Sequence, residues 1–360
     1  MVRMPPLPQG RAGRVRVVVV GASGNVGTAV VRRLVAEPDV SLVGVSRRTP
    51  RGAPYDAVSW VRADLGAPPA TERLAKAFAG ADAVVHLGWR LQPSWDLEAL
   101  ERINVRGSAA VVDACLSAGV PHLVHASSVG AYAASPGPQR RDESWPATGI
   151  ASSTYGRQKA AVERRLDRVD PGELGVLRLR PAIVLQPDAA GEIARFFLGP
   201  LVPTSLLRPS LLRRLPVLPW PGGLRIQLVH ADDLADAIAR ALRARTTGAL
   251  NVATEPVLDA AVAGAALGAR PVPVPLGAVR ALAYGTWRAH LQPTEPGWLD
   301  LATGLPLMDT TRAREELGWT PVHDAAEALL SFLPALAAGR GTSSPALKPR
   351  GLLRGRRALG

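Results

Sequence analysis

Cysteine is almost absent from this chain, and its scarcity limits the kind of protein it can be. One cysteine, Cys115, occurs among 360 residues, so no internal disulfide can form. Its place in the apolar helical pattern VVDACL favours a buried structural thiol over a nucleophile. We therefore expect a reducing, cytoplasmic setting. No segment repeats at a fixed period, which excludes collagen-like, solenoid and low-complexity architectures.

Long uninterrupted hydrophobic runs are also lacking. The first apolar run, VRVVVVG, leads into a glycine motif rather than a small-residue cleavage site, so we expect no signal peptide. The leucine-rich stretch 196–220 is interrupted by several prolines and by Arg208, Arg213 and Arg214. These residues exclude an ordinary membrane span.

Acidic residues are missing from both ends of the chain, and this accounts for most of the formal net charge of +13. Residues 1–16 and 340–360 together carry ten positive charges, which leaves +3 for the body. The composition of the two ends predicts disordered, solvated basic tails over 1–14 and 340–360. A weak contact with anionic surfaces stays open, but we expect no specific nucleic-acid partner and no transmembrane segment.

The body of the chain alternates short apolar runs with helical patterns. Both faces of the apolar runs read as buried, which is typical of a parallel sheet covered by helices on each side. The runs occupy residues 15–21, 41–46, 58–63, 81–88, 122–129 and 175–185. The sequence therefore predicts an α/β fold with a doubly wound parallel sheet.

The segment GASGNVG closes the first apolar run and opens a helix. Gly21 permits a tight turn, Gly24 lets the backbone approach a pyrophosphate, and Gly27 lets the helix pack on the strand. Since strand, spacing and helix agree, we predict a dinucleotide-binding Rossmann domain over residues 15–186 rather than a purely structural turn. The other loop positions expected to contact the cofactor are Ser23, Asn25 and Val26.

An acidic residue is missing where the second run ends. NAD-preferring sites usually offer Asp or Glu there, but this chain has Ser46, Arg47 and Arg48. Guanidinium groups pair bidentately with phosphate, so the sequence favours NADP(H), with NAD as the alternative. The two arginines could also simply solvate the end of a strand. Asp64, after the third run, is placed to meet the adenine amino group, although Asp is an ordinary turn residue as well.

Lys159 is one of only three lysines in a chain with forty arginines, and it follows Tyr155 by four residues. Side chains four apart on a helix share a face. Lys159 can hold the ribose hydroxyls of a cofactor and lower the pKa of Tyr155, whose ordinary value of about 10 is too high for a base. Tyr155 would then serve as an acid in reduction or a base in oxidation. Ser128 can hydrogen-bond the substrate oxygen, with Ser127 as its competitor.

With these motifs the chain resembles the extended short-chain dehydrogenases/reductases of the NAD-dependent epimerase/dehydratase family. The resemblance covers about residues 15–335 and rests on several motifs in the expected order. They are GASGNVG, ADL at 63–65, HLG at 86–88, NVRG at 104–107, ASSVGAY at 126–132, YGRQK at 155–159, RLRP at 178–181, LVHADDLADA at 228–237 and DTTRAREELGWTP at 309–321.

The resemblance implies a catalytic set of Ser128, Tyr155 and Lys159, and it favours Ser128 because this serine lies four residues before Tyr132. It also implies a supporting role for Asn104 in the proton relay, and no metal site. In this family Asp232 and Asp233 would belong to a structural, domain-joining helix. Further cofactor contacts are implied at Leu65, Leu87, Gly88 and Pro181.

Two departures from the family pattern bear on the chemistry. Trp89 follows HLG where small residues are common, so we expect it to narrow the nicotinamide side of the cleft. Family dehydratases carry an Asp-Glu pair after the catalytic hydroxyl, whereas Val129 and Gly130 stand here. Dehydratase chemistry is therefore disfavoured.

The second half of the chain is expected to select the substrate. We predict a smaller C-terminal substrate-binding lobe from residues 187–225 and 255–335, with 226–253 returning to the main sheet. Apolar residues in 187–225 suggest a lining for a hydrophobic carbonyl compound, although they could be ordinary core, and the arginines there could instead hold a diphosphate. These apolar residues are Phe196, Phe197, Leu206, Leu207, Leu211, Leu212 and Trp220.

We therefore expect an NADP(H)-dependent oxidoreductase that acts on a small-molecule carbonyl or alcohol. One alternative is a sugar-nucleotide epimerase that retains NAD, which would return the hydride to the same substrate. Another is an inactive NADP(H)-sensing protein, which the presence of both Tyr155 and Lys159 disfavours. Self-association into a homodimer stays open.

Overall fold

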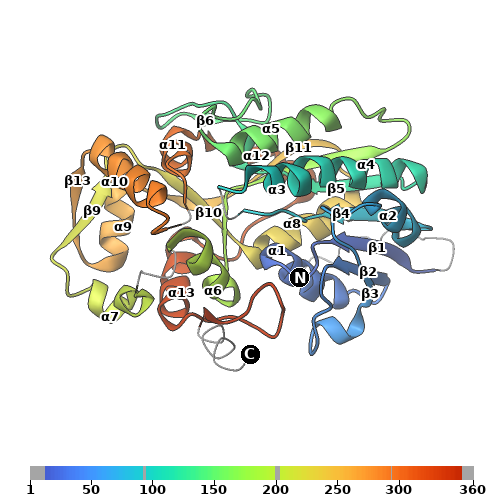
Figure 1. Cartoon of the computed structure of the whole chain (residues 1–360), viewed down its shortest axis with the longest axis horizontal. Helices are drawn as coiled ribbons and strands as arrows, with labels where there is room; N and C mark the ends of the chain where they lie inside the picture. The colour runs from blue at the N-terminus through green and yellow to red at the C-terminus, as the bar shows by residue number, and fades with distance from the viewer. Residues whose placement is uncertain (1–12, 92–94, 199–202, 293, 351–360) are drawn as a thin grey trace.

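A seven-stranded parallel sheet forms the centre of the molecule (Figure 1). The computed structural model describes residues 13–91, 95–198, 203–292 and 294–350. The sheet order is β11-β7-β5-β4-β1-β2-β3, and every neighbouring pair is parallel. Its strands are β1 (Val15–Val20), β2 (Val40–Ser46), β3 (Ser59–Arg62), β4 (Ala83–His86), β5 (His122–Ala126), β7 (Gly175–Pro181) and β11 (Gly248–Val252). The predicted doubly wound α/β fold is confirmed.

The run of valines in β1 shows why both faces of this sheet are covered. Side chains alternate along a strand, so Val17 and Val19 enter one core while Val18 and Val20 enter the other. Helices α1 and α8 cover the first face, and α2, α4 and α5 cover the second. The helices of this half are α1 (Asn25–Val35), α2 (Ala70–Phe78), α3 (Leu97–Glu101), α4 (Gly107–Ser117), α5 (Thr154–Leu166) and α8 (Ala231–Ala244), with short turns η1 (Tyr55–Ala57), η2 (Arg102–Arg106) and η3 (Val129–Ala131).

Three smaller sheets lie beside the main one. In the first, β10 (Ile226–His230) lies between β8 (Ile183–Leu185) and β12 (Thr254–Leu258). The second pairs β9 (Val217–Pro221) with β13 (Arg270–Val274), and the third pairs β6 (Arg140–Arg141) with β14 (Leu307–Met308). The segment 226–253 was expected to rejoin the main sheet. This holds for β11 but is wrong for β10. The chain leaves the main sheet just after Pro181, which has no N–H to donate to a neighbouring strand, and β8 then pairs with β10.

The remaining helices build the lobe on the left of Figure 1 and its connection back to the larger part. They are η4 (Pro187–Ala189), α6 (Ala190–Ile193), η5 (Ala194–Leu198), η6 (Thr204–Leu207), α7 (Pro209–Leu212), α9 (Ala260–Leu267), α10 (Leu276–Arg288), α11 (Gly297–Gly304), α12 (Thr311–Leu317) and α13 (Ala325–Ala338). Helix α12 returns to the larger part, where its Ala313 and Leu317 join the core beneath α8. Asp233 of α8 accepts hydrogen bonds from the backbone of Val322 and His323, so it ties these elements together.

The prediction of a disordered tail from residue 340 onward is wrong for residues 340–350. This segment folds back on itself after α13, and its Ser344 and Leu347 are completely buried. A composition argument misses it because a few buried contacts and hydrogen bonds hold a short polar loop. The predicted disorder of residues 1–12 and 351–360 lies outside the described residues.

The lone cysteine behaves as a structural residue. Cys115 lies on α4 and is completely buried against the sheet. Burial raises the pKa of its thiol, which keeps the sulfur protonated and unreactive. Among the described helices, none has the length and hydropathy needed to cross a membrane.

Candidate active site

The glycine loop lies between β1 and α1, at the carboxyl edge of the sheet. Gly21 has a φ of +87°, and a Cβ at this position would come within 2.8 Å of the Gly88 nitrogen in the loop after β4. A side chain would therefore push the two loops apart. Gly24 is the N-cap residue of α1, so no side chain caps the first turn of this helix. The first backbone N–H groups of this helix therefore have no side-chain cap, and helix N-termini of this kind can bind anions.

Asn25 and Gln186 connect this loop to the strand β8. The Gln186 side chain donates to the Asn25 backbone oxygen at 2.7 Å and to its Oδ1 at 2.8 Å. Asn25 in turn donates to the Val184 carbonyl at 3.3 Å. Gln186 gave no motif in the sequence, because its partner lies 161 residues away.

The residues expected at the adenosine end have different environments. Ser46 is buried and donates its hydroxyl to the Arg48 carbonyl at 2.9 Å, so it shapes the loop after β2. Arg47 and Arg48 are exposed, and neither guanidinium makes an ion pair or hydrogen bond within the described part of the chain. Asp64 accepts from the Gly66 N–H at 2.9 Å, as an ordinary turn residue does. Both arginines are therefore available to an anion.

The remaining predicted cofactor contacts lie at the ends of the central strands or in the first turn of α1. Leu87 donates its backbone N–H to the Val20 carbonyl at 2.8 Å, which fixes the loop after β4 against β1. Leu65 and Val26 are partly buried against the two cores, and Gly27 and Pro181 are buried.

Tyr155 and Lys159 project from the first turns of α5 toward the ends of β4 and β5. The Tyr155 hydroxyl is hydrogen-bonded to Ser128, as predicted for a shared site. Gly130 makes this approach possible, since a Cβ there would lie 2.7 Å from Cε1 of Tyr155. Lys159 donates from Nζ to the Ala126 carbonyl at 2.8 Å. The structure thus brings Ser128, Tyr155 and Lys159 together.

The pKa values of Tyr155 and Lys159 differ from those expected from the sequence, which predicted a lowered pKa for Tyr155. Burial raises the pKa of Tyr155 to about 12, and the hydrogen bond from Ser128 only partly opposes this rise. Burial also lowers the pKa of Lys159 to about 7, although the nearby carboxylate of Glu163 acts in the other direction. Tyr155 is therefore a phenol at neutral pH, not the depressed base that the sequence suggested.

The structure distinguishes the two neighbouring serines. Ser127 donates its hydroxyl to Oε1 of Glu163, which also accepts from Nε of Arg180 at 2.9 Å. All three side chains are buried, so this hydroxyl belongs to a structural network. Ser128 accepts from the Gly130 N–H at 3.0 Å and keeps its own proton for another partner.

Asn104 lies in the π-helical turn η2 and contacts the loop after β4. Its Oδ1 accepts from the Arg90 N–H at 2.7 Å, and its Nδ2 donates to the Arg90 carbonyl at 2.9 Å and to Gln158 at 2.8 Å. The side chain therefore positions a loop rather than bonding directly to Lys159. π-turns occur frequently at functional sites.

Aromatic side chains surround the Tyr155 phenol. The Trp89 ring lies under Lys159, with Nζ 3.6 Å from the ring centroid, and 6.0 Å from the Tyr155 ring. Trp298, at the start of α11, stands 4.9 Å from Tyr155 on another side, and Phe197 packs edge-on against Trp298 at 5.0 Å. Trp89 and Trp298 line a hollow beside Tyr155 that also includes Leu91 and Leu100, and Phe197 supports Trp298 from behind. Sequence reasoning anticipated Trp89 but missed Trp298, which carries no motif.

Most of the apolar residues expected to line the site do not reach it. Of the seven apolar residues predicted in 187–225, Phe197 belongs to the aromatic cluster, because its ring packs against Trp298. Leu206 and Leu211 are 60% and 37% exposed, and Leu207 packs beneath α13. Helix α7, which is flanked by Arg208, Arg213 and Arg214, lies at the lower left of Figure 1, away from α5.

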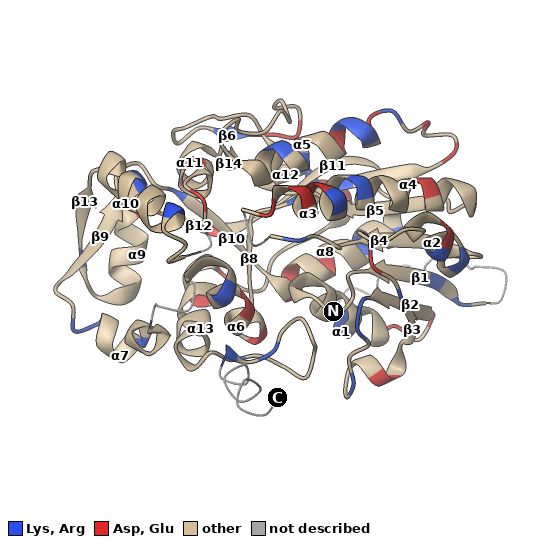
Figure 2. Cartoon of the chain, in the orientation of Figure 1, with Lys and Arg blue, Asp and Glu red and all other residues tan. Residues whose placement is uncertain are grey.

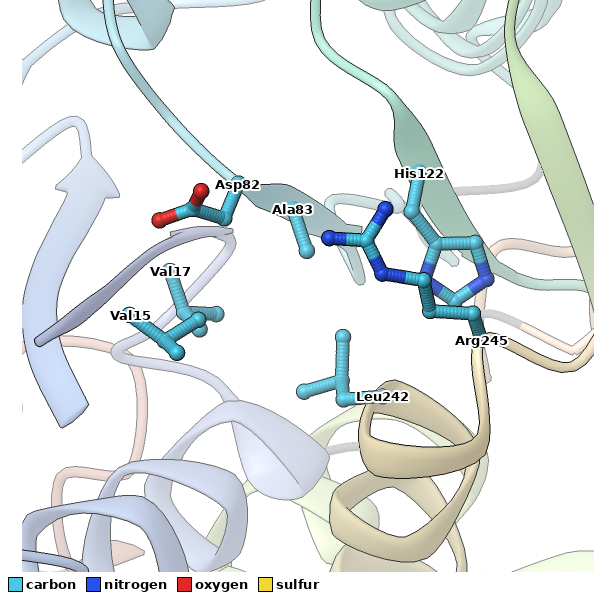
Figure 3. Close-up of a pocket in the computed structure, with 7 residues that line it drawn as sticks. All are labelled: Val15, Val17, Asp82, Ala83, His122, Leu242 and Arg245. Carbon is cyan, nitrogen blue, oxygen red and sulfur yellow. The ribbon is translucent and has the colours of Figure 1, made fainter. Parts of the chain in front are cut away.

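Another hollow lies at the opposite edge of the sheet (Figure 3). It is lined by the starts of β1, β4 and β5 and by the end of α8, with Arg245 beside His122. Ligands of open parallel sheets bind at the carboxyl ends of the strands. This hollow therefore lies on the wrong edge for the chemistry of Tyr155.

Comparisons with known proteins agree with this geometry. The chain is 29% identical to an uncharacterized Mycobacterium tuberculosis protein over 259 residues, which are 70% of this chain and 63% of that protein. It is 28% identical to the UDP-glucose 4-epimerase of Azospirillum brasilense over 334 residues, covering 88% and 90% of the two chains. It is 34% identical to the L-arabinose 1-dehydrogenase (NAD(P)(+)) of Haloferax volcanii, but over only 31% of this chain and 41% of that one.

The fold has close counterparts among solved structures. A Thermus thermophilus UDP-glucose 4-epimerase in complex with NAD superposes with a TM-score of 0.63 at 22% identity, covering 89% of this chain and 99% of that one. Residues 17–253 match the sequence profile of the family described as NAD dependent epimerase/dehydratase. The match covers more than half of the chain and contains the glycine loop and Ser128, Tyr155 and Lys159. The chain belongs to the NAD dependent epimerase/dehydratase family.

Proposed function

We propose that this protein is an NADP(H)-dependent oxidoreductase that interconverts an apolar carbonyl compound and its alcohol. The observation that carries the proposal is the aromatic hollow beside Tyr155. Trp89 and Trp298 offer ring surface to the hollow, Leu91 and Leu100 add aliphatic surface, and Phe197 packs against Trp298. Flat apolar groups gain most from such surfaces, so we expect a hydrophobic aldehyde, ketone or enone to be preferred here.

Two side chains, Ser128 and Tyr155, act on the substrate oxygen in this proposal. Ser128 donates its hydroxyl to the oxygen and holds it beside Tyr155. Tyr155 gives up its phenolic proton to the oxygen in reduction and takes it back in oxidation. When bound, the nicotinamide supplies or accepts the hydride. Because burial raises the pKa of Tyr155 to about 12, the phenol carries the proton at neutral pH, which is the state that reduction needs.

Lys159 has a positioning and electrostatic role. Its ammonium would hold the ribose hydroxyls of the cofactor and would favour loss of the Tyr155 proton by its positive charge. Because the pKa of Lys159 is about 7, its ammonium is only partly protonated at neutral pH. Asn104 holds the Arg90 backbone and thereby the loop that carries Trp89.

The preference for NADP(H) rests on the loop after β2. Arg47 and Arg48 are exposed and unpaired within the described residues, and no carboxylate stands at the end of β2 to repel a 2′-phosphate. Guanidinium groups bind phosphate through charge-assisted hydrogen bonds. A cofactor drawn from the reduced NADP pool suits a net reductase.

Sugar-nucleotide epimerisation with retained NAD is the second candidate. It is supported by the similarity to an annotated epimerase along 88% of this chain. Arg90 and Glu295 also border the hollow, and they could hold polar groups of a sugar. The surrounding rings favour the apolar substrate.

A substrate screen separates the two candidates. Purified protein should be free of stoichiometric nicotinamide and should oxidise NADPH when an apolar aldehyde, ketone or enone is added, as followed at the nicotinamide absorbance. UDP-sugars should cause no net change and should not be epimerised. Tightly bound NAD together with conversion of one UDP-sugar into its epimer, without net cofactor turnover, would reverse the assignment.

A further inference from the structure

The segment 340–350, here called the C-terminal strap, is a folded loop with its own internal bonds. It begins where α13 ends at Gly339, whose φ of +61° turns the chain back. The Thr342 N–H donates to the Leu347 carbonyl at 2.7 Å, and the Leu347 N–H donates to the Ser344 carbonyl at 3.1 Å. Ser344 and Leu347 are completely buried. The strap therefore has a defined position on the protein.

One end of the strap is fastened to the substrate lobe. The guanidinium of Arg195 donates to the carbonyls of Lys348 at 2.6 Å and Ala346 at 3.1 Å. The Gly191 N–H donates to the Arg340 carbonyl at 2.7 Å. A Cβ on Gly191 would lie 2.9 Å from that carbonyl oxygen, so the two segments are in close contact.

The tip of the strap reaches the dinucleotide-binding half. Ser344 donates its hydroxyl to the Ser23 carbonyl at 2.6 Å, and Ser343 donates to the Arg51 carbonyl at 2.9 Å. Ser23 belongs to the glycine loop after β1, and Arg51 belongs to the loop after β2 that also carries Arg47. In Figure 1 the red strap runs from α13 toward α1. It thus bridges the two loops between which the adenosine ribose of a dinucleotide lies.

The contacts of the strap leave the phosphate-binding groups accessible. Its bond to the glycine loop is accepted by a carbonyl, and it uses none of the backbone N–H groups of residues 24–27 that a pyrophosphate needs. The strap itself carries Lys348 and two arginines and no acidic residue, as the blue segments near the C-terminus in Figure 2 show. Arg340 forms an ion pair with Asp188 at 3.0 Å, but the strap together with Asp188 remains net positive, which complements a polyanion.

We propose that the C-terminal strap closes over the adenosine half of the bound dinucleotide and slows its exchange. The proposal rests on the cofactor binding in the proposed function but not on which substrate is reduced. The strap joins the lobe to the dinucleotide-binding half across this end of the site, so release requires the Ser343 and Ser344 contacts to break. A net reductase must open the strap once per turnover, whereas an epimerase works with the strap closed.

The test measures cofactor dissociation without any substrate. NADPH, and separately NADH, is bound to the full-length protein and displaced with excess oxidised cofactor in a stopped-flow instrument. In the double variant Ser343→Ala/Ser344→Ala we expect dissociation of both cofactors to become about 10-fold faster, because two hydrogen bonds are lost. The control Ser331→Ala removes an exposed hydroxyl on α13 that bonds only to the Ala328 carbonyl, and it should dissociate like the wild type.

A second variant releases the other end of the strap. Arg195→Ala removes both bonds to the strap carbonyls and should also speed dissociation, while circular dichroism and thermal melting report whether the fold is kept. Unchanged dissociation rates in both variants would overturn the proposal, as would slower dissociation, which would mean that the strap obstructs the site. A wild-type protein that binds the cofactors but reduces no carbonyl compound would refute the proposed function alone. One that binds neither cofactor would refute both.

Discussion

The two halves of this chain are packed very differently. In the dinucleotide-binding half, β4 and β5 are almost completely buried, and residues from both faces of the main sheet fill two large cores. In the substrate lobe, α10 has no buried residue, and its Leu282 and Tyr284 are 69% and 53% exposed. The lobe has a smaller core of its own around α13, and Trp298 and Phe197 pack beside Tyr155 at its border with the larger half.

We expect the packing of the larger half to determine the stability of the fold and the lobe to determine substrate specificity. Residues of the sheet that hold the glycine loop and Tyr155 are tightly packed, so changes there should be costly to the fold. Trp298 of the lobe faces the hollow and is only partly buried, so we expect its substitution to change the substrate site more than the fold. Changes in the two halves should therefore affect different measurements.

The largest effect is expected at the junction of the halves. Tyr155→Phe removes the phenolic hydroxyl and should lower turnover by about 10² to 10⁴-fold, because the proton donor is lost. Cofactor affinity, measured by fluorescence titration, should stay close to that of the wild type. Tyr284→Phe, on the exposed face of α10, is the matched control and should keep full activity. Full turnover in Tyr155→Phe would remove this residue from the chemistry.

The lobe is tested by Trp298→Ala. Loss of the ring that packs on Tyr155 should lower kcat/KM for an apolar carbonyl substrate by about 10- to 100-fold, while the affinity for NADPH changes little. Trp287→Ala changes a tryptophan of α10 that lies beside Tyr284, outside the hollow, and serves as control. If Trp298→Ala instead weakened cofactor binding and spared kcat/KM, the division between the two halves would be wrong.

The cofactor half is tested by the double variant Arg47→Ala/Arg48→Ala. Binding of NADPH should weaken by about 10-fold or more, because charge-assisted bonds to the 2′-phosphate are lost, while NADH binding should hardly change. Titrating both cofactors into this variant and into Arg73→Ala, an exposed arginine on α2, gives the comparison. An unchanged preference in the double variant would exclude these arginines from 2′-phosphate recognition.

The smallest effect concerns the buried end of β4. Burial lowers the pKa of His86 to about 3 from 6.5, and the Lys159 charge adds to this. Between these pH values His86 is protonated in the unfolded chain but neutral in the folded chain. The free energy of unfolding therefore falls as the pH drops from about 6.5 toward 3. His86→Gln should therefore lose less thermal stability than the wild type between about pH 7 and pH 4.5. His290→Gln, at an exposed histidine, should follow the wild type, and an unaltered slope in His86→Gln would contradict this account.

The sequence predicted those parts of the site that depend on local spacing. The glycine loop and the Tyr155–Lys159 pair follow from patterns within a single strand–helix unit or a single helix, so their positions could be read directly. The choice of Ser128 over Ser127 came from the family resemblance, and the bond of Ser127 to Glu163 gives it a physical reason.

Contacts between distant segments could not be predicted in the same way. Trp298 meets Tyr155 across 143 positions of sequence, and Ser344 meets Ser23 across 321. Nothing in the composition of 340–350 distinguishes a folded strap from a solvated tail, since a polar segment with two serines, two prolines and three basic residues is compatible with both. The raised pKa of Tyr155 was also missed, because burial depends on tertiary packing and outweighs the hydrogen bond from Ser128.

The π-helical turn η2 changes which side chains of one continuous helix face the sheet. Helical residues run without a break from Leu97 to Ser117, and a π-turn accommodates one extra residue within such a run. The phase of the helix therefore changes midway, so that Asn104 meets the Arg90 backbone while Cys115 still faces the sheet. Deleting one residue from this turn would restore a regular helix and force one of these two alignments to be lost. In a related sequence that lacks one residue at positions 102–106, we therefore expect the loop after β4 to be positioned by contacts other than that of Asn104 with the Arg90 backbone.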